Sequence, residues 1–159
     1  MPNEITGALN VAESRFAIVV SNYNESITGS LLAGALETLA TAGVADDRID
    51  VARVPGAWEL PLPAQVLAAS GRYQAVLCLG AVIRGETTHD QHINRQVSLS
   101  LGRISLETGV PVSFGLLTCN SLDQAIHRAG GNVGNKGCEC AAAALEMAGL
   151  MQRLRDDSS

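Results

Sequence analysis

Three short, almost unbroken apolar runs constrain the fold of this chain more than any other feature. They cover residues 16–20 (FAIVV), 75–79 (AVLCL) and 112–117 (VSFGLL). Apolar runs of this length without alternation are typical of parallel strands that are covered on both faces, so we predict three central strands. Residues 49–54 (IDVARV) carry Asp50 and Arg53 among apolar neighbours, and we predict an edge strand there, with one side facing water.

Helical patterns lie between these runs. Three apolar stripes have helical spacing, and their members are Leu32, Ala35, Leu36 and Leu39; Ile93, Val97, Leu101 and Ile104; and Met147, Leu150, Met151 and Leu154. Gly43 stands where a glycine ends the first of these helices. Pro61 and Pro63 fit only the opening turn of a further helix. The small side chains of residues 140–144 (CAAAA) should let the last helix approach a neighbour closely.

The alternation of strands with helices implies right-handed crossovers and a doubly wound sheet. We therefore predict an α/β fold, a flavodoxin-like three-layer α/β/α sandwich with a four-stranded parallel sheet. A chain of 159 residues can bury one full core and is too short for two ordinary domains. We expect a single domain over residues 1–159, with about 14 N-terminal and about 5 C-terminal residues extended or frayed.

The composition argues against several classes of partner. The net charge is −5, and the 11 Lys and Arg residues form no basic cluster, which argues against nucleic acid. No apolar run approaches the roughly 18 residues that a membrane span needs, and residues 1–10 lack the order of a signal peptide. We expect a cytoplasmic protein with no membrane partner. Its four cysteines, Cys78, Cys119, Cys138 and Cys140, are interpreted as reduced, buried thiols.

Polar or glycine-containing segments follow all four predicted strands. They are residues 22–24 (NYN), 55–59 (PGAWE), 80–89 (GAVIRGETTH) and 118–120 (TCN). Ligands of open α/β sheets bind beyond the carboxyl ends of the strands. We therefore predict an enzyme whose active site lies at this edge, with residues 80–89 at its centre.

Tyr23 and Trp58, two of the few aromatic residues, both fall at this edge. They could form the walls of a slot for a planar ring, or they could plug the end of the sheet. Glu59 could accept hydrogen bonds from substrate hydroxyls, or it could be an ordinary acidic partner of a helix dipole.

Two segments could hold a phosphate group. The turn formed by residues 85–88 leads into a helix that begins near His89 and exposes backbone amides, although a polar capping turn explains it equally. Arg128 ends a helix and could supply the planar guanidinium that phosphate recognition favours, or it could interact with the helix dipole.

His89 and His92 are three residues apart, so a metal site is conceivable, but no accompanying carboxylate pattern supports one. We interpret His89 as a proton carrier beside the phosphate-holding turn. Lys136, in a loop before the last helix, is either a ligand contact or a solvated charge.

Together these segments resemble the lumazine synthase (6,7-dimethyl-8-ribityllumazine synthase) family, which catalyses the penultimate step of riboflavin biosynthesis. The resemblance extends from about residue 16 to residue 154. It is carried by residues 16–24, 54–61 (VPGAWELP), 80–85 (GAVIRG), 87–89 (TTH), 111–115 (PVSFG), 124–130 (QAIHRAG) and 134–137 (GNKG).

The resemblance implies condensation of 5-amino-6-(D-ribitylamino)uracil with 3,4-dihydroxy-2-butanone 4-phosphate, without a cofactor or a metal. Tyr23 would stack on the pyrimidine, Glu59 would bind ribityl hydroxyls and His89 would shuttle protons. The implied substrate-binding residues are Tyr23, Asn24, Ala57, Trp58, Glu59, Ala81, Val82, Ile83, Phe114 and Lys136. The implied phosphate-binding residues are Gly85, Glu86, Thr87 and Arg128, the last from the neighbouring subunit.

The chain departs from the family pattern at three places. Tyr23 stands where many relatives have Phe or Trp, and Glu139, the expected partner of Arg128, stands where Asp is also common. His89 is followed by Asp90, Gln91 and His92, where an aromatic residue and an acid are usual.

Family members form pentamers or icosahedral shells of pentamers, and the short loop at residues 130–137 favours a shell. The alternatives are an archaeal-type riboflavin synthase and a flavin-binding shell protein without turnover.

Overall fold

The computed structural model describes residues 1–131 and 134–157. Four parallel strands form the main sheet in the order β2-β1-β3-β4. Their bounds are β1 Phe16–Ser21, β2 Ile49–Val54, β3 Ala75–Ile83 and β4 Val112–Cys119. The helices are α1 Glu25–Thr41, α2 Pro61–Ala69, α3 His89–Thr108, α4 Leu122–Arg128 and α5 Lys136–Asp157.

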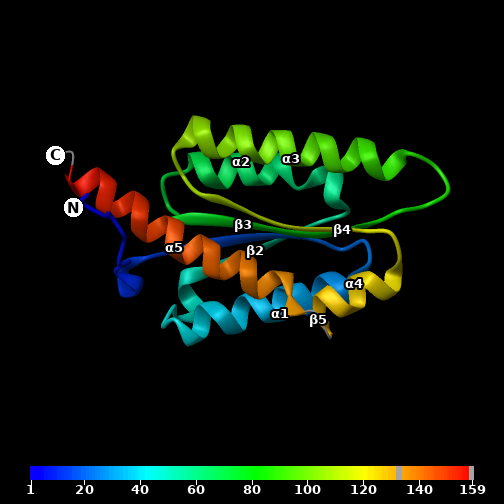
Figure 1. The fold of residues 1–159 in the computed structure, drawn as a ribbon, viewed down its shortest axis with the longest axis horizontal. Helices are drawn as coiled ribbons and strands as arrows, with labels where there is room; N and C mark the ends of the chain where they lie inside the picture. Colours follow the sequence, from blue (N-terminus) through cyan, green and yellow to red (C-terminus); the bar gives the residue numbers. More distant parts are fainter. Residues whose placement is uncertain (132–133, 158–159) are drawn as a thin grey trace.

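Helices α1, α4 and α5 cover one face of the sheet, and α2 and α3 cover the other (Figure 1). Each face contributes to its own buried cluster: Ile18 and Leu77 point toward α1 and α5, while Val19 and Val76 point toward α2 and α3. The predicted flavodoxin-like three-layer α/β/α sandwich with a four-stranded parallel sheet is confirmed.

The predicted positions in the sheet are correct for β1 and β3, which are central strands, and for β2, which is an edge strand. The predicted position of β4 is wrong. We predicted a central strand at residues 112–117, and β4 instead forms an edge of the four-stranded sheet. Phe114 on this strand is 40% exposed. Helices α3, α4 and α5 all pack on β4. They bury Leu116 and Leu117, although one lateral side of the strand meets no strand of this sheet.

The strand register creates a crevice at the carboxyl end of the sheet. Strand β1 pairs with β3 only as far as Leu79, whereas β4 pairs with β3 as far as Ile83. Residues 80–83 therefore extend beyond β1, and one edge of their backbone faces no described strand. This edge is where the topology places a ligand in an open α/β sheet.

The local signals at three helix ends predict the structure correctly. Gly43 follows α1 with φ +99°, and the amide of Val44 donates to the carbonyl of Leu39, which is the pattern of a glycine-terminated helix. Pro61 is the first residue of α2, and His89 is the first residue of α3.

The predicted apolar stripe of α5 is wrong. The helix buries Cys140, Ala141, Ala144 and Ala148, whereas Met147 is 43% exposed. Helix α5 packs against α1, and Cys140, Ala141 and Ala144 of the predicted small-residue segment are buried. Just before that segment, a Cβ atom at Gly137 would lie 1.9 Å from the carbonyl oxygen of Leu31. Close approach replaces the large apolar contacts that the stripe implied.

The N-terminal segment lies beside the C-terminal helix α5 (Figure 1). Residues 1–10 contain no helix or strand, and Gly7 packs directly on Gly149 of α5. Helix α5 continues to Asp157, so the tail that we expected to fray from residue 155 is helical through residue 157. The rest of that prediction, residues 158–159, lies outside the described residues.

Short elements complete the chain. They are the 3-10 helices η1 Val11–Glu13, η2 Asp46–Arg48 and η3 Ala57–Glu59, and the antiparallel pair β5 Ala129–Gly131 and β6 Gly134–Asn135. The loop expected at residues 130–137 thus consists partly of strands, and residues 132–133 of it lie outside the described part. Lys136 begins α5 rather than preceding it. No helix within the described ranges is long and apolar enough to cross a membrane.

Candidate active site

A cavity of about 600 Å³ opens at the carboxyl end of the sheet, between η3, α3 and the extended end of β3. Three of the four polar segments predicted from the sequence meet in it. The predicted site residues that line it are Tyr23, Ala57, Trp58, Glu59, Ala81, Val82, Ile83, Gly85, Thr87 and His89. The fold therefore brings together side chains that are up to 66 positions apart in the sequence, from Tyr23 to His89.

Tyr23 and Trp58 both border this cavity with largely open side chains. Tyr23 is 71% exposed and Trp58 is 53% exposed. Neither ring is buried in the core, so the alternative that they plug the end of the sheet does not hold. The arrangement suits rings that a planar ligand covers.

The segment that carries Tyr23 is held on two sides. The amides of Asn22 and Tyr23 donate to the carbonyls of Val54 and Pro55, at 2.8 and 2.9 Å. Asn24 has a left-handed backbone, with φ 63° and ψ 52°, and its Nδ2 donates to the carbonyl of Ala81 at 3.3 Å. The Asn24 side chain does not line the cavity; its hydrogen bond ties the end of β1 to β3.

Glu59 is an acidic partner at a helix start and also lines the cavity. Its Oε2 accepts a hydrogen bond from the backbone amide of Gly56 at 3.1 Å, which closes the first turn of η3. The same carboxylate lines the cavity. Its orientation is therefore set by the turn that also places Trp58.

The turn before α3 is partly a capping structure. Thr87 Oγ1 accepts from the amide of His89 at 3.3 Å, and the carbonyl of Thr88 accepts from the amide of Gln91 at 3.0 Å. Gly85, Glu86 and Thr87 are exposed. Gly85 and Thr87 line the cavity whereas Glu86 does not. The turn thus places the N-terminus of the 20-residue helix α3, which is the positive end of the helix dipole, at the rim of the cavity.

Four other predicted residues lie in a second cavity of about 410 Å³. Phe114 from β4, Arg128 from the end of α4, and Lys136 and Glu139 from the start of α5 line it. The chain therefore separates Arg128 from His89. Arg128 and Glu139 share this cavity, but no ion pair joins them among the residues that the structure describes.

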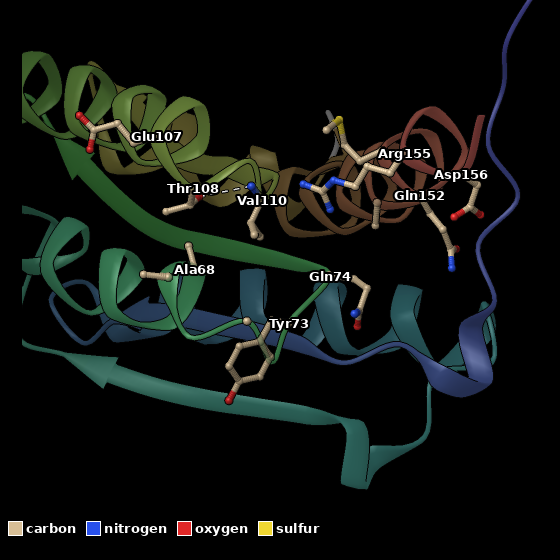
Figure 2. A pocket seen from close by; sticks show the side chains of 13 residues that line it. Ala68, Tyr73, Gln74, Glu107, Thr108, Val110, Gln152, Arg155 and Asp156 are labelled. Atoms are coloured by element: carbon tan, nitrogen blue, oxygen red, sulfur yellow. Dashed lines mark hydrogen bonds between the residues drawn. The ribbon is translucent and has the colours of Figure 1, made fainter. Parts of the chain in front are cut away.

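A slightly larger cavity, about 660 Å³, lies at the opposite, amino end of the sheet (Figure 2). Several of its polar groups already serve the fold. The hydroxyl of Tyr73 donates to Asp50 at 2.5 Å, the side-chain carbonyl of Gln74 accepts from the amide of Arg15 at 2.6 Å, and Arg155 donates to the carbonyl of Gly109. Size alone therefore does not identify the site.

Two lining residues of the first cavity were not predicted from the sequence. Asp90 and Ile93 reach it from the first turns of α3. The signal that could have identified them is their spacing, since residues three apart share one side of a helix and Asp90 is adjacent to His89.

The other candidate groups lie apart from the first cavity. His92 is exposed on α3, and within residues 1–131 and 134–157 no three potential metal ligands cluster together. All four cysteines are free: Cys78, Cys119 and Cys140 are buried, and Cys138 is half-buried. Burial raises the pKa of Cys140 to about 11 and raises that of Cys78 further.

Residues 13–152 match the sequence model of a family described as 6,7-dimethyl-8-ribityllumazine synthase. The chain belongs to the 6,7-dimethyl-8-ribityllumazine synthase family. A protein of that name from Desulfotalea psychrophila (strain LSv54 / DSM 12343) is 52% identical over 155 residues, which cover 98% of this chain and 100% of that protein. Its namesake from Desulfatibacillum aliphaticivorans is 46% identical with the same coverage.

The resemblance to the lumazine synthase family is thus confirmed. The match includes every residue that lines the first and second cavities, because they lie between Tyr23 and Glu139. Both cavities therefore belong to the part of the chain that is shared with lumazine synthases.

Proposed function

We propose that this chain condenses 5-amino-6-(D-ribitylamino)uracil with 3,4-dihydroxy-2-butanone 4-phosphate to give 6,7-dimethyl-8-ribityllumazine, phosphate and water, the penultimate step of riboflavin biosynthesis. The observation that carries the proposal is the match to lumazine synthases over 98% of the chain. The cavity that gathers Tyr23, Trp58 and His89 supports it.

The geometry suits a flat heterocycle at the sheet end. Tyr23 stacks on the pyrimidine, Trp58 and Glu59 line the ring and the ribityl chain, and the open edge of residues 80–83 offers backbone groups to the ring edge. This strand edge carries Ala81, Val82 and Ile83, of which the carbonyl of Ala81 already accepts from Asn24.

The phosphate of the second substrate binds at the turn of residues 85–87, beside His89. The amine attacks the ketone, and an imine forms with loss of one water; phosphate then leaves, and the ring closes with loss of a second water. Each step moves a proton, which His89 carries. Holding the two substrates side by side supplies much of the acceleration, and the positioned acid or base adds roughly 10²- to 10⁴-fold.

We further propose that the site is completed by a neighbouring subunit in a pentamer. Phe114, Arg128 and Lys136 line a cavity of their own rather than the one that contains His89. A complete site then needs the first cavity of one copy and the second cavity of another. We also propose that the protein is cytoplasmic, forms a single domain and assembles its pentamers into an icosahedral shell.

The decisive experiment mixes the two substrates with the purified protein and follows the fluorescence of the lumazine. Formation of lumazine with release of one phosphate per turnover is the expected result. Consumption of lumazine without use of the butanone phosphate would instead indicate a riboflavin synthase, and flavin binding without turnover would indicate a shell protein. Sedimentation velocity tests the pentamer and the shell.

A further inference from the structure

Asn135 joins three elements of the fold beside the second cavity. Its Oδ1 accepts hydrogen bonds from the amides of Gly137 and Cys138, at 2.7 and 3.3 Å, and so caps the start of α5. Its Nδ2 donates to the carbonyl of Ser30 in α1 at 3.0 Å. Its backbone pairs with Ala129 in β5. One residue therefore fixes where α5 begins relative to α1 and β5.

Helix α1 has room for this side chain because residue 34 is a glycine. A Cβ atom at Gly34 would lie 2.6 Å from Cγ, Nδ2 and Oδ1 of Asn135. This distance is far shorter than a van der Waals contact, so the amide and a β-carbon cannot occupy the same place. Gly29, the other glycine of α1, differs from Gly34, since a Cβ atom added there meets nothing within 4 Å. The close fit is thus specific to the place that the Asn135 amide occupies.

Asn135 directly precedes Lys136, the first residue of α5. Lys136 lines the second cavity together with Glu139, one turn later on the same helix. A lysine side chain is a flexible four-carbon stem, so the place that its ammonium group can reach depends on where the backbone is anchored. Asn135 provides this anchor through its hydrogen bonds to α1 and α5. It does not itself line the cavity, so its influence on a ligand there passes through its neighbours.

We infer that Asn135 is a positioning residue, which holds Lys136 where it contacts the ribitylaminouracil. The inference rests on the proposed function, in which Lys136 reaches this substrate from the neighbouring subunit. It goes further because it assigns a role to a residue that touches neither substrate. His89 begins α3 and Arg128 ends α4, so the effect of Asn135 should be confined to the affinity for one substrate.

The test compares Asn135→Ala with the wild-type protein in steady-state kinetics with each substrate varied in turn. We expect the KM for the ribitylaminouracil to rise about tenfold, as for loss of a hydrogen bond to a charged group. The kcat and the KM for the butanone phosphate should stay nearly unchanged, because the variant loses binding of one substrate and not the chemistry. Equal increases of both KM values would indicate a general loosening of the fold and would overturn the inference.

Gly34→Ala tests the same role without altering Asn135, and Gly29→Ala is its matched control. The methyl group added at residue 34 takes the place of the Asn135 amide, which can move aside because it is the free end of a side chain. We expect Gly34→Ala to reproduce the selective rise in the KM for the ribitylaminouracil. Gly29→Ala should leave both KM values as in the wild-type protein. If the two glycine variants behaved alike, the fit of the amide on α1 would have no role, and the inference would fail.

A double-mutant cycle shows whether Asn135 acts through Lys136. Lys136→Met removes the ammonium group from the cavity. In that background, Asn135→Ala should cause little or no further rise in the KM for the ribitylaminouracil, because the contact that Asn135 positions is already lost. If the two substitutions instead raised the KM by independent factors that multiply, Asn135 would act by another route and the inference would be refuted.

The formation of lumazine by the wild-type protein separates this inference from the proposed function. Wild-type protein that formed no lumazine would refute the proposed function, and the positioning role with it. Wild-type protein that formed lumazine, with the same KM for the ribitylaminouracil as Asn135→Ala, would refute only the positioning role.

Discussion

The side-chain amide of Asn24 donates a hydrogen bond to the carbonyl oxygen of Ala81, 57 positions later in the chain. This bond joins the end of β1 to the part of β3 that extends beyond it. Asn24 is the only described residue other than glycine with a positive φ. Asparagine tolerates this left-handed conformation better than most residues, so one residue supplies both the turn and the bond.

Asn24→Ala should lower the free energy of unfolding by about 2 kcal/mol. The variant loses a hydrogen bond, and alanine tolerates the left-handed region less well than asparagine does. Asn24→Gly should cost less, about 1 kcal/mol, because glycine adopts this backbone freely. Urea unfolding of both variants measures the difference. Equal destabilisation by the two substitutions would mean that backbone strain plays no part.

Arg128→Ala should almost abolish activity and weaken the butanone phosphate far more than the ribitylaminouracil. The physical reason is the loss of charge-assisted hydrogen bonds to a phosphate. Separate KM values for the two substrates measure the two losses of affinity. Arg153→Ala, on the last turns of α5, is the control for the removal of an arginine elsewhere. A similar loss of affinity for both substrates would contradict the phosphate role.

His89→Ala should reduce turnover by about 10²-fold or more while substrate binding is largely retained, because a placed acid or base accelerates the chemistry rather than the binding. Turnover is followed by lumazine fluorescence, and binding by quenching of Trp58. Unchanged turnover would remove His89 from the proton-transfer step.

Gly137→Ala should destabilise the fold by about 3 kcal/mol or more, because its Cβ would lie 1.9 Å from the carbonyl oxygen of Leu31 and force α5 away from α1. Gly102→Ala is the matched control in the interior of α3, where an added Cβ meets nothing within 4 Å. This control should raise stability by about 0.5–1 kcal/mol. Thermal or urea unfolding would show whether the two glycines differ in this way.

Tyr73→Phe should make stability less dependent on pH. The hydroxyl of Tyr73, followed by Arg15, lowers the pKa of Asp50 below its ordinary 3.8, so this contribution exists above that pH and is lost as pH falls through the lowered pKa. Burial and the Asp50 carboxylate raise the pKa of Tyr73 above its ordinary 10.0, so its contribution exists below that pH and is lost as pH rises through the raised pKa.

Unfolding free energies of the wild-type protein and Tyr73→Phe, measured from acid to alkaline pH, test this expectation. The variant should be less stable at neutral pH and should show flatter profiles at both extremes. Parallel profiles that differ only by a constant would show that the hydrogen bond contributes no pH dependence.

Short-range signals in the sequence predict several helix ends. The glycine at residue 43 ends α1, Pro61 opens α2, and α3 begins at His89. Such signals are reliable here because a helix end is decided by backbone angles and hydrogen bonds within a few residues. The polar segments at the strand ends also predicted most of the residues that line the 600 Å³ cavity.

Only the tertiary structure decided the edge position of β4 and the buried side of α5. The separation of Arg128 from His89 within one chain agrees with the neighbouring-subunit role that the family resemblance implied. An apolar run indicates that helices cover a strand, but it does not indicate which strands lie beside that strand. Likewise, α5 buries its alanines because α1 approaches closely, which depends on the shape of a distant segment. Lateral order, close approach and the distance between two strand ends result from packing across the whole chain, and so the sequence pattern of each element leaves them open.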